Sequence, residues 1–191
     1  MKKLALVALL ALELAVSGCG TSGAPSTTTN TQAAGNWEAQ LTGGTDQASL
    51  LNFVTTFTVT NNGPLDVTGF GFFNAGSCFV TGTNAETVSG NASFTTSSTN
   101  TVTGTLTLTV TSATNGSVLT LGTPTAATLT GTSNGTTTTT GTLSNGVVVG
   151  QWSLSPGTGI TGCNAASGNF IMCQATATCT PTTAAAIKKP E

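Results

Sequence analysis

The sequence predicts an all-β protein, built as a single antiparallel meander of roughly 8–10 strands. Three observations predict this fold class. Apolar residues alternate with polar ones in several short segments, as in strands with one buried face. Asn-Gly pairs recur between these segments, and Asn-Gly favours the tight turn of a β-hairpin. No segment keeps a helical period over three turns. The pattern fits a closed or partly closed β-barrel, and it equally fits an immunoglobulin-like β-sandwich.

The first predicted strand opens at Gly35, and every second residue from Trp37 onwards is apolar until the segment ends. Such alternation is typical of a half-buried strand. A second strand is predicted over residues 51–59, where Phe53 and Phe57 share one face. We expect this face, with Trp37, to point into the core.

The second strand is expected to stop at Asn61-Asn62-Gly63-Pro64, where Asn62-Gly63 is a hairpin-turn signal. Further turns are expected at Asn115-Gly116, Asn134-Gly135 and Asn145-Gly146. Residues 101–111 form a strand of alternating apolar residues and threonines, with Gly104 in the inward register. A glycine there predicts a bend or a close approach of another backbone. Residues 147–154 and 169–173 complete the predicted set.

The start of the chain has the composition of an export signal. Two lysines are followed by an apolar run, and Val16-Ser17-Gly18 leads into Cys19. The run is shorter than the roughly 20 residues that a membrane-spanning helix requires. The pattern resembles the lipobox of bacterial lipoproteins, which implies cleavage before Cys19 and acylation of its thiol.

The lipobox resemblance implies a protein of the cell envelope, held on the membrane by acyl chains on Cys19. The residue that follows is Gly20 rather than the aspartate that retains many lipoproteins at the inner membrane. We therefore expect an outer-membrane location in a host that has one. The predicted divisions of the chain are a signal peptide (1–18), a lipidated cysteine with a flexible tether (19–34), a β domain (35–179) and a disordered tail (180–191).

The composition excludes several classes of function. Charged residues make up 5% of the chain, against roughly 25% in an ordinary soluble domain. The chain has no Arg, His or Tyr, and all its lysines lie near the two ends: Lys2, Lys3, Lys188 and Lys189. A nucleic acid needs cations to replace its counterions, so we expect no nucleic-acid partner. A Ser-His-Asp triad cannot be assembled, and we expect neither an enzyme nor a cofactor.

The carboxylates that remain inside the predicted domain are few: Glu38, Asp46, Asp66 and Glu86. A pair of them is the minimum that glycoside hydrolysis requires. No local motif surrounds any of the four, and none stands in a calcium-binding loop pattern. We interpret them as solvated acids at turns and strand edges, and we expect no metal site.

Four cysteines lie within the predicted domain: Cys78, Cys163, Cys173 and Cys179. An even number outside the cytosol predicts two disulfides. We favour the pairs Cys78–Cys163 and Cys173–Cys179, because the first would tie early strands to the last hairpin and the second would pin the tail. A local bridge from Cys163 to Cys173 is the alternative.

Three resemblances extend this interpretation. Gly35-x-Trp37 on a first strand is similar to the opening of lipocalin and avidin-like barrels, where the tryptophan closes one end of the barrel. Residues 57–64 are similar to a strand and turn of immunoglobulin-like repeats in bacterial surface proteins, which implies a sandwich. As a whole, the domain resembles Thr/Gly-rich β-structured envelope lipoproteins.

We expect a structural, adhesive or interaction protein of the envelope with no catalytic role. Low charge and few edge lysines favour binding of a protein partner by strand addition at a free edge. The alternative is a calycin-like barrel that binds a small apolar or neutral ligand inside. The candidate residues for such a site are Trp37, Phe53 and Phe57.

Overall fold

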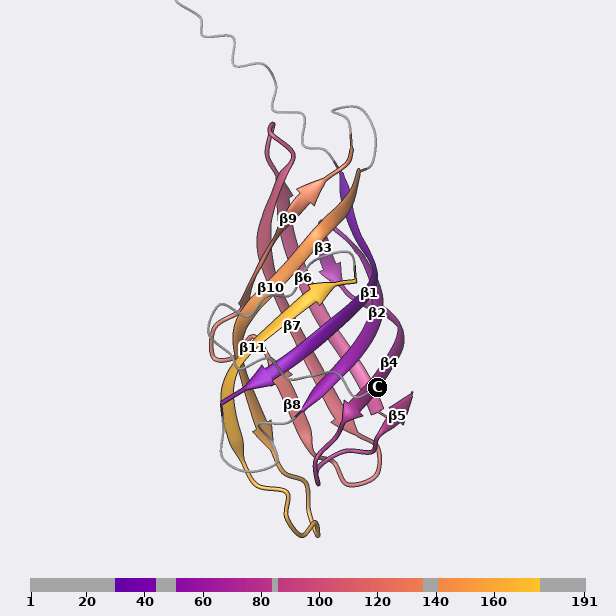
Figure 1. Ribbon diagram of the computed structural model, residues 1–191, viewed down its shortest axis with the longest axis vertical. Helices are drawn as coiled ribbons and strands as arrows, with labels where there is room; N and C mark the ends of the chain where they lie inside the picture. Colours follow the sequence, from indigo (N-terminus) through magenta and orange to yellow (C-terminus); the bar gives the residue numbers. More distant parts are fainter. Residues whose placement is uncertain (1–29, 44–50, 84–85, 136–140, 176–191) are drawn as a thin grey trace, which may run out of the picture.

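All the strands of the described chain belong to one sheet of 11 strands (Figure 1). The structure is a computed structural model, and it describes residues 30–43, 51–83, 86–135 and 141–175. The strands are β1 (Thr31–Thr42), β2 (Asn52–Thr60), β3 (Asn62–Pro64), β4 (Asp66–Asn74), β5 (Gly82–Thr83), β6 (Glu86–Thr96), β7 (Thr101–Ser112), β8 (Val118–Leu121), β9 (Ala127–Ser133), β10 (Gly141–Ser155) and β11 (Ala166–Gln174). No helix occurs among these residues. The all-β prediction is confirmed.

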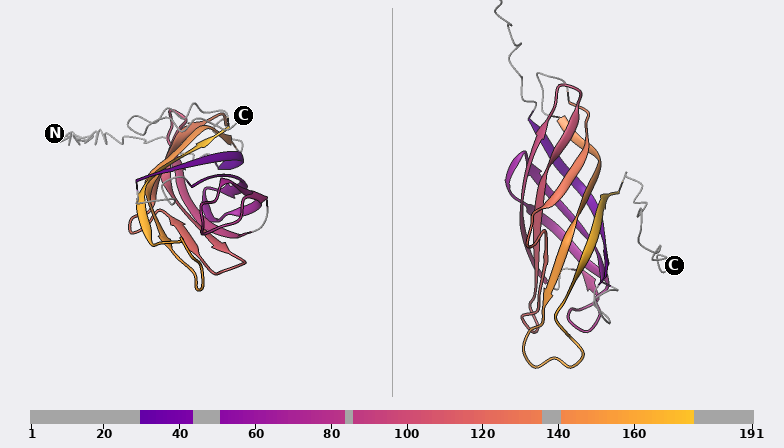
Figure 2. Two further views of the ribbon diagram at one scale, coloured as in Figure 1. Left: turned by 60° about the horizontal axis from the view of Figure 1, so that its bottom comes forward. Right: turned by 90° about the vertical axis from the view of Figure 1, so that its left-hand side faces the viewer.

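The sheet curls on itself into a partly closed ring (Figure 2). A meander runs from β6 to β11, and β11 then pairs with β1, which pairs with β2 and through it with β4. The three residues of β3 pair with β6 and bridge the two ends of this path. Pairing is antiparallel throughout, except for a short parallel contact between β1 and β10 and an isolated bridge beside β5. One continuous sheet forms, and not the two packed sheets of a sandwich.

Two short strands share one place in the sheet. Both β8 and β9 lie between β7 and β10, and each pairs with a different part of these two long strands. The turn over residues 122–126 separates them. Gly122 has a positive φ of 81° and donates its backbone N–H to the carbonyl oxygen of Gln151 on β10. The turn therefore stays attached to the sheet while it interrupts the strand.

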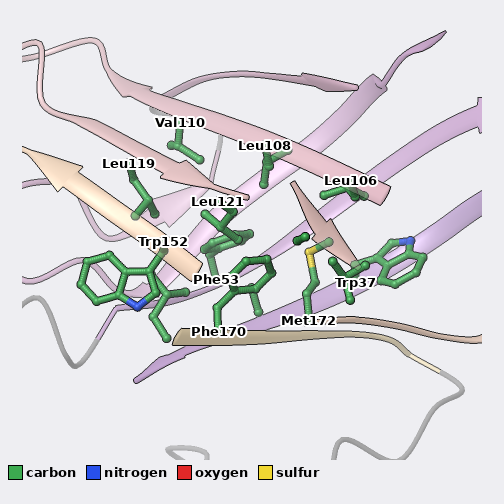
Figure 3. Packing of buried hydrophobic residues seen from close by; sticks show 14 of the residues in the cluster. Trp37, Phe53, Leu106, Leu108, Val110, Leu119, Leu121, Trp152, Phe170 and Met172 are labelled. Carbon is green, nitrogen blue, oxygen red and sulfur yellow. The ribbon is translucent and has the colours of Figure 1, made fainter. Parts of the chain in front are cut away.

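Alternate residues of the long strands fill the interior, as the periodicity predicts. Figure 3 shows Trp37 and Trp152 at opposite ends of the labelled cluster, with Phe53, Phe170 and Met172 between them. Both tryptophans are almost fully buried. The indole N–H of Trp152 donates to the carbonyl oxygen of Thr42 at 3.2 Å. The interior is thus largely occupied by the protein's own side chains.

The predicted tether boundary at residue 34 is wrong, because β1 begins at Thr31. Thr31 is fully buried, and its hydroxyl lies 2.7 Å from that of Thr96 and 3.2 Å from that of Ser133. Its backbone N–H donates to the side chain of Asn61. These partners come from distant parts of the chain. A polar segment without apolar periodicity therefore becomes a strand through non-local hydrogen bonds.

Two of the four predicted Asn-Gly turns are wrong. Asn115-Gly116 does turn between β7 and β8, and Asn134-Gly135 follows β9 directly, with the next residues outside the described chain. Asn145-Gly146 instead lies inside β10. It forms a bulge there, with a shift of register between Ser144 and Val147 and a φ of 52° at Asn145. Positive φ is the common requirement of bulge and turn.

The Asn62-Gly63 pair lies inside β3. The predicted end of the second strand is confirmed, because β2 ends at Thr60 and the chain bends at Asn61, whose φ is 44°. The chain then runs alongside β6 rather than folding back as a hairpin.

Gly104 lies where the sequence places it, in the inward register of β7 opposite Phe94 of β6. A Cβ atom added to Gly104 would collide with the Ser93 carbonyl oxygen and with Phe94. The predicted close approach of a neighbouring backbone is confirmed. The side chain of Phe94 is nearly fully buried.

Gln174 ends β11 at the point where β1 and β10 converge. Its side-chain NH₂ donates to the carbonyl oxygens of Ala34 on β1, at 2.8 Å, and of Leu143 on β10, at 3.0 Å. Its side-chain oxygen accepts the backbone N–H of Gly146 at 3.1 Å. One buried amide therefore provides, in the fork between two strands, the hydrogen bonds that a further strand residue would have made.

Candidate functional site

The aromatic residues proposed for an internal site pack together in the core. Trp37 stacks on Phe57, with ring centroids 5.3 Å apart and an interplanar angle of 13°. Phe53 contacts Phe70 and Phe72, at centroid distances of 4.9 and 5.8 Å. Contacts of this kind stabilise the folded chain by about 0.5–1.5 kcal/mol per pair beyond area burial. The structure thus brings Trp37 and Phe57 together, and places Phe53 in a phenylalanine cluster.

Trp37 also carries an unusual polar group. Its indole Nε1 is buried and has no hydrogen-bond partner among the described residues. A buried donor without an acceptor costs about 1–3 kcal/mol. This donor stays unsatisfied among the described residues, in an interior that side chains largely fill.

A disulfide ties the loops at the lower end of the ring in Figure 1. Cys78 follows β4 and Cys163 precedes β11, and their sulfur atoms are bonded, with a Cα–Cα distance of 5.0 Å. This prediction is confirmed, and the alternative Cys163–Cys173 bridge is excluded. The turn after β7 joins the same cluster, because Asn115 donates to the Cys78 carbonyl oxygen at 3.1 Å and the Ser117 hydroxyl lies 3.6 Å from the Cys163 sulfur.

Cys173 is also half of a disulfide. Its partner lies outside the described residues, as Cys179 does, so the Cys173–Cys179 pairing stays a prediction. Cys19 and the whole lipobox lie outside the described residues as well.

The ring is open along one edge, between the lower parts of β4 and β6. The ladder between β3 and β6 ends with a hydrogen bond of 2.9 Å from Leu65 N–H to the Gly90 carbonyl oxygen. Beyond that point β4 pairs with β2 on its other side and meets β5 at Gly71. Within the described chain, no strand pairs with residues 66–69 or 86–89 on the sides that face each other. No β ladder therefore covers this edge in the described chain, although the Gly69 carbonyl oxygen accepts the Thr55 hydroxyl at 3.1 Å.

The side chains at this open edge are acidic and apolar. Asp66 begins β4 and Glu86 begins β6. The Glu86 carboxylate accepts the backbone N–H of Val80 at 3.1 Å through Oε1, whereas its Oε2 is buried with no partner among the described residues. Phe73 and Val80, near β5, are 42% and 44% exposed. A strand with a cationic side chain would complement this edge.

A cleft of about 300 Å³ lies on the outer face of the sheet. It is lined by Thr123, Pro124, Gln151, Trp152, Ser153, Ser167, Gly168 and Asn169. The wall is the turn between β8 and β9, and the floor is formed by β10 and β11. None of the residues in this lining carries a charge, which distinguishes the cleft from the acidic edge.

The carboxylates named from the sequence do not form one cluster. Glu38 lies on β1, which is not a neighbour of β4 or β6 in the sheet, and Asp66 and Glu86 begin the two strands of the open edge. Asp46 lies outside the described residues. No group of three or more His, Cys, Asp or Glu that could hold a metal ion occurs in the described part of the chain. Nor does any helix there have the length and apolarity to cross a membrane.

Sequence reasoning missed both the outer cleft and Gln174. Gln151 and Ser153 alternate visibly with apolar residues within one predicted strand. Their partners across the cleft, Asn169 and Ser167, are determined by the register of β10 with β11, which the sequence does not state. A glutamine next to a cysteine at the end of a strand carries no signal that its amide is buried.

Comparison of the chain with protein-family models, with curated proteins and with solved structures finds no match.

Proposed function

We propose that this chain is a non-catalytic, lipid-anchored module of the bacterial cell envelope that binds a protein partner by accepting one of its strands at the open edge between β4 and β6. The observation that carries the proposal is the edge itself. Residues 66–69 and 86–89 have no strand partner there within the described chain, and backbone hydrogen bonds to an added strand are a common mode of peptide recognition.

The chemistry of the edge favours an extended segment that carries a basic residue. Asp66 and Glu86 are two of the three charged side chains in the described residues, and the third, Glu38, is also acidic. The described domain therefore contains no cation to pair with them. A partner lysine or arginine would form a charge-assisted hydrogen bond with the exposed carboxylate of Asp66.

The anchor places this edge at the membrane surface. Acyl chains on Cys19 would hold the domain to the outer membrane of a host that has one, through the residues that precede β1. One acyl chain gives marginal binding, whereas two signals give stable attachment. The low charge of the domain suits a display role, because specificity then rests on strand pairing rather than on long-range electrostatics.

The proposal is tested by site-specific photocrosslinking in the host that makes the protein. A photoreactive amino acid replaces Ser89, on the free edge, or Thr105, an exposed control on β7 that is paired on both sides. We expect a discrete protein adduct from position 89 only, with its crosslinked peptide carrying a basic residue. The adduct should disappear when Glu86→Lys is added. Equal labelling from both positions, or no adduct at position 89, would overturn the proposal.

A second candidate function is the binding of a small neutral ligand inside the ring, beside Trp37. The unpartnered Trp37 Nε1 favours it. Native mass spectrometry of the protein from its own host should then release a stoichiometric small molecule on denaturation. Trp37→Phe, which keeps a ring on Phe57 but removes the donor, should lose that molecule. If the purified protein carries acyl groups and releases no other small molecule, the interior holds no ligand and this second candidate is wrong.

A further inference from the structure

The outer cleft owes its concave shape to the interrupted strand between β7 and β10. β8 pairs with residues 152–155 of β10, and β9 pairs with residues 143–149. The turn over residues 122–126 stands between these two pairings, held by the hydrogen bond from Gly122 to Gln151. Thr123 and Pro124 of this turn form a wall above an otherwise continuous sheet surface.

The floor of the cleft carries two matched pairs of polar side chains. Gln151 lies directly opposite Asn169, and Ser153 directly opposite Ser167, on the outer face of β10 and β11. Side chains opposite each other are about 5 Å apart, and successive pairs on one face are about 7 Å apart. The four groups therefore form a small rectangle of amides and hydroxyls.

The polar side chains on the floor of the cleft are not used in hydrogen bonds within the protein. The side chains of Gln151, Ser153, Ser167 and Asn169 make no hydrogen bond with the described protein. Gln174 contrasts with them, because its amide makes three hydrogen bonds and is buried. The amides of the cleft thus present unused donors and acceptors in a concave site.

The lining selects against most ligand classes. It contains no cation for a phosphate or carboxylate and no carboxylate for a metal ion or an amine. An apolar ligand would bury the amides without partners, at a cost. A neutral molecule rich in hydroxyl groups can use every amide and hydroxyl of the floor.

Apolar surface borders the same floor. The Pro124 ring forms part of the wall, and Val149, which is 46% exposed, lies opposite Ile171 in the adjoining pair. A sugar ring has the matching combination, because its hydroxyls lie at the rim and its C–H groups form apolar faces. The volume of about 300 Å³ is at the lower end of the range for small-molecule sites, which suits one small unit rather than a long buried chain.

We propose that the cleft between the β8–β9 turn and the β10–β11 surface binds an uncharged saccharide unit, free or within a longer glycan. This goes beyond the proposed function, since the cleft and the open edge lie on different strands. Failure of either leaves the other in place: loss of a crosslink at position 89 says nothing about the cleft.

The test uses the full chain in detergent. The protein is first applied to an array of neutral and acidic oligosaccharides. Each neutral glycan that binds on the array is then added stepwise to the protein and followed by NMR. We expect neutral glycans alone to bind, with shifts in the side-chain amide signals of Gln151 and Asn169. The double variant Gln151→Ala, Asn169→Ala should weaken binding by about tenfold or more, since each hydrogen bond contributes about 1 kcal/mol. Comparison of monosaccharides with oligosaccharides distinguishes a free sugar from a glycan unit.

Asn91→Ala is the matched control, because this exposed amide lies on β6, away from the cleft. It should bind as the unmodified chain does. All the substituted residues are exposed, so thermal unfolding should change little, and an unchanged midpoint verifies folding. Absence of neutral-glycan binding, a preference for acidic glycans, or equal affinity of the double variant and the control would overturn the proposal.

Discussion

The side-chain amide of Gln174 donates a hydrogen bond of 2.8 Å to the carbonyl oxygen of Ala34, across 140 residues of sequence. With its bonds to Leu143 and Gly146, it joins the last strand to the first and to β10. At this position the Gln174 side chain spans the fork between β1 and β10, whose parallel contact is only two residue pairs long.

Gln174→Leu should therefore destabilise the fold. The substitution replaces the amide with an apolar side chain of similar size. It leaves the carbonyl oxygens of Ala34 and Leu143 and the N–H of Gly146 without their hydrogen-bond partner. We expect the free energy of unfolding to fall by about 2–4 kcal/mol, measured by urea denaturation. Gln151→Leu, an exposed glutamine whose side chain has no such partners, should change it by less than about 0.5 kcal/mol. Equal changes in the free energy of unfolding for the two variants would show that the buried amide of Gln174 does not stabilise the fold.

Loss of the Cys78–Cys163 disulfide should lower the free energy of unfolding mainly by raising the entropy of the unfolded state. The bond closes a loop with a sequence separation of 85 residues. The double variant Cys78→Ala, Cys163→Ala should lose about 4 kcal/mol of stability, from the entropy of that loop. Guanidinium denaturation measures it, with the non-reduced parent chain as reference. A loss under about 1 kcal/mol would mean that the unfolded chain is already confined.

Two glycine substitutions should differ in effect because their surroundings differ. Gly104→Ala would drive a Cβ atom into the Ser93 carbonyl oxygen and Phe94, and we expect a loss of about 1–3 kcal/mol. Gly69→Ala would place its Cβ at an ordinary 3.5 Å from the Thr56 hydroxyl oxygen. That variant should be neutral or more stable by about 0.5 kcal/mol. Thermal unfolding of both proteins checks the order, and a reversed order would contradict the close packing of β6 on β7.

The anchor predicts a covalent change at Cys19. The chain purified from its host should begin at Cys19 and carry the added mass of acyl chains, and it should sediment with membranes. Cys19→Ser should lack the acyl mass and lose the stable attachment, since no acceptor thiol remains. Intact-mass measurement and membrane fractionation test this. An unacylated native chain, or a variant that still attaches through its domain, would remove the lipid from the proposed function.

Both ends of the first strand illustrate how far sequence reasoning reaches. Trp37 and the alternate residues that follow it point inward as predicted, because side-chain direction in a strand has a local period of two. The composition around Thr31 predicts a tether, because the burial of Thr31 depends on hydroxyls and an amide from β6, β9 and the β2–β3 bend. Asn145-Gly146 shows the same limit: positive φ was predictable, but whether it makes a turn or a bulge depends on what β10 pairs with.

By itself, the sequence determined the all-β class, the inward-facing residues of the strands it predicted and the side chains that the chain lacks. All of these follow from local periodicity and composition. Only the tertiary structure decided the open edge at Asp66 and Glu86, the fork filled by Gln174 and the cleft whose floor carries Gln151 and Asn169. Each depends on which strands become neighbours and in which register, and that choice is made by contacts between residues far apart in the chain.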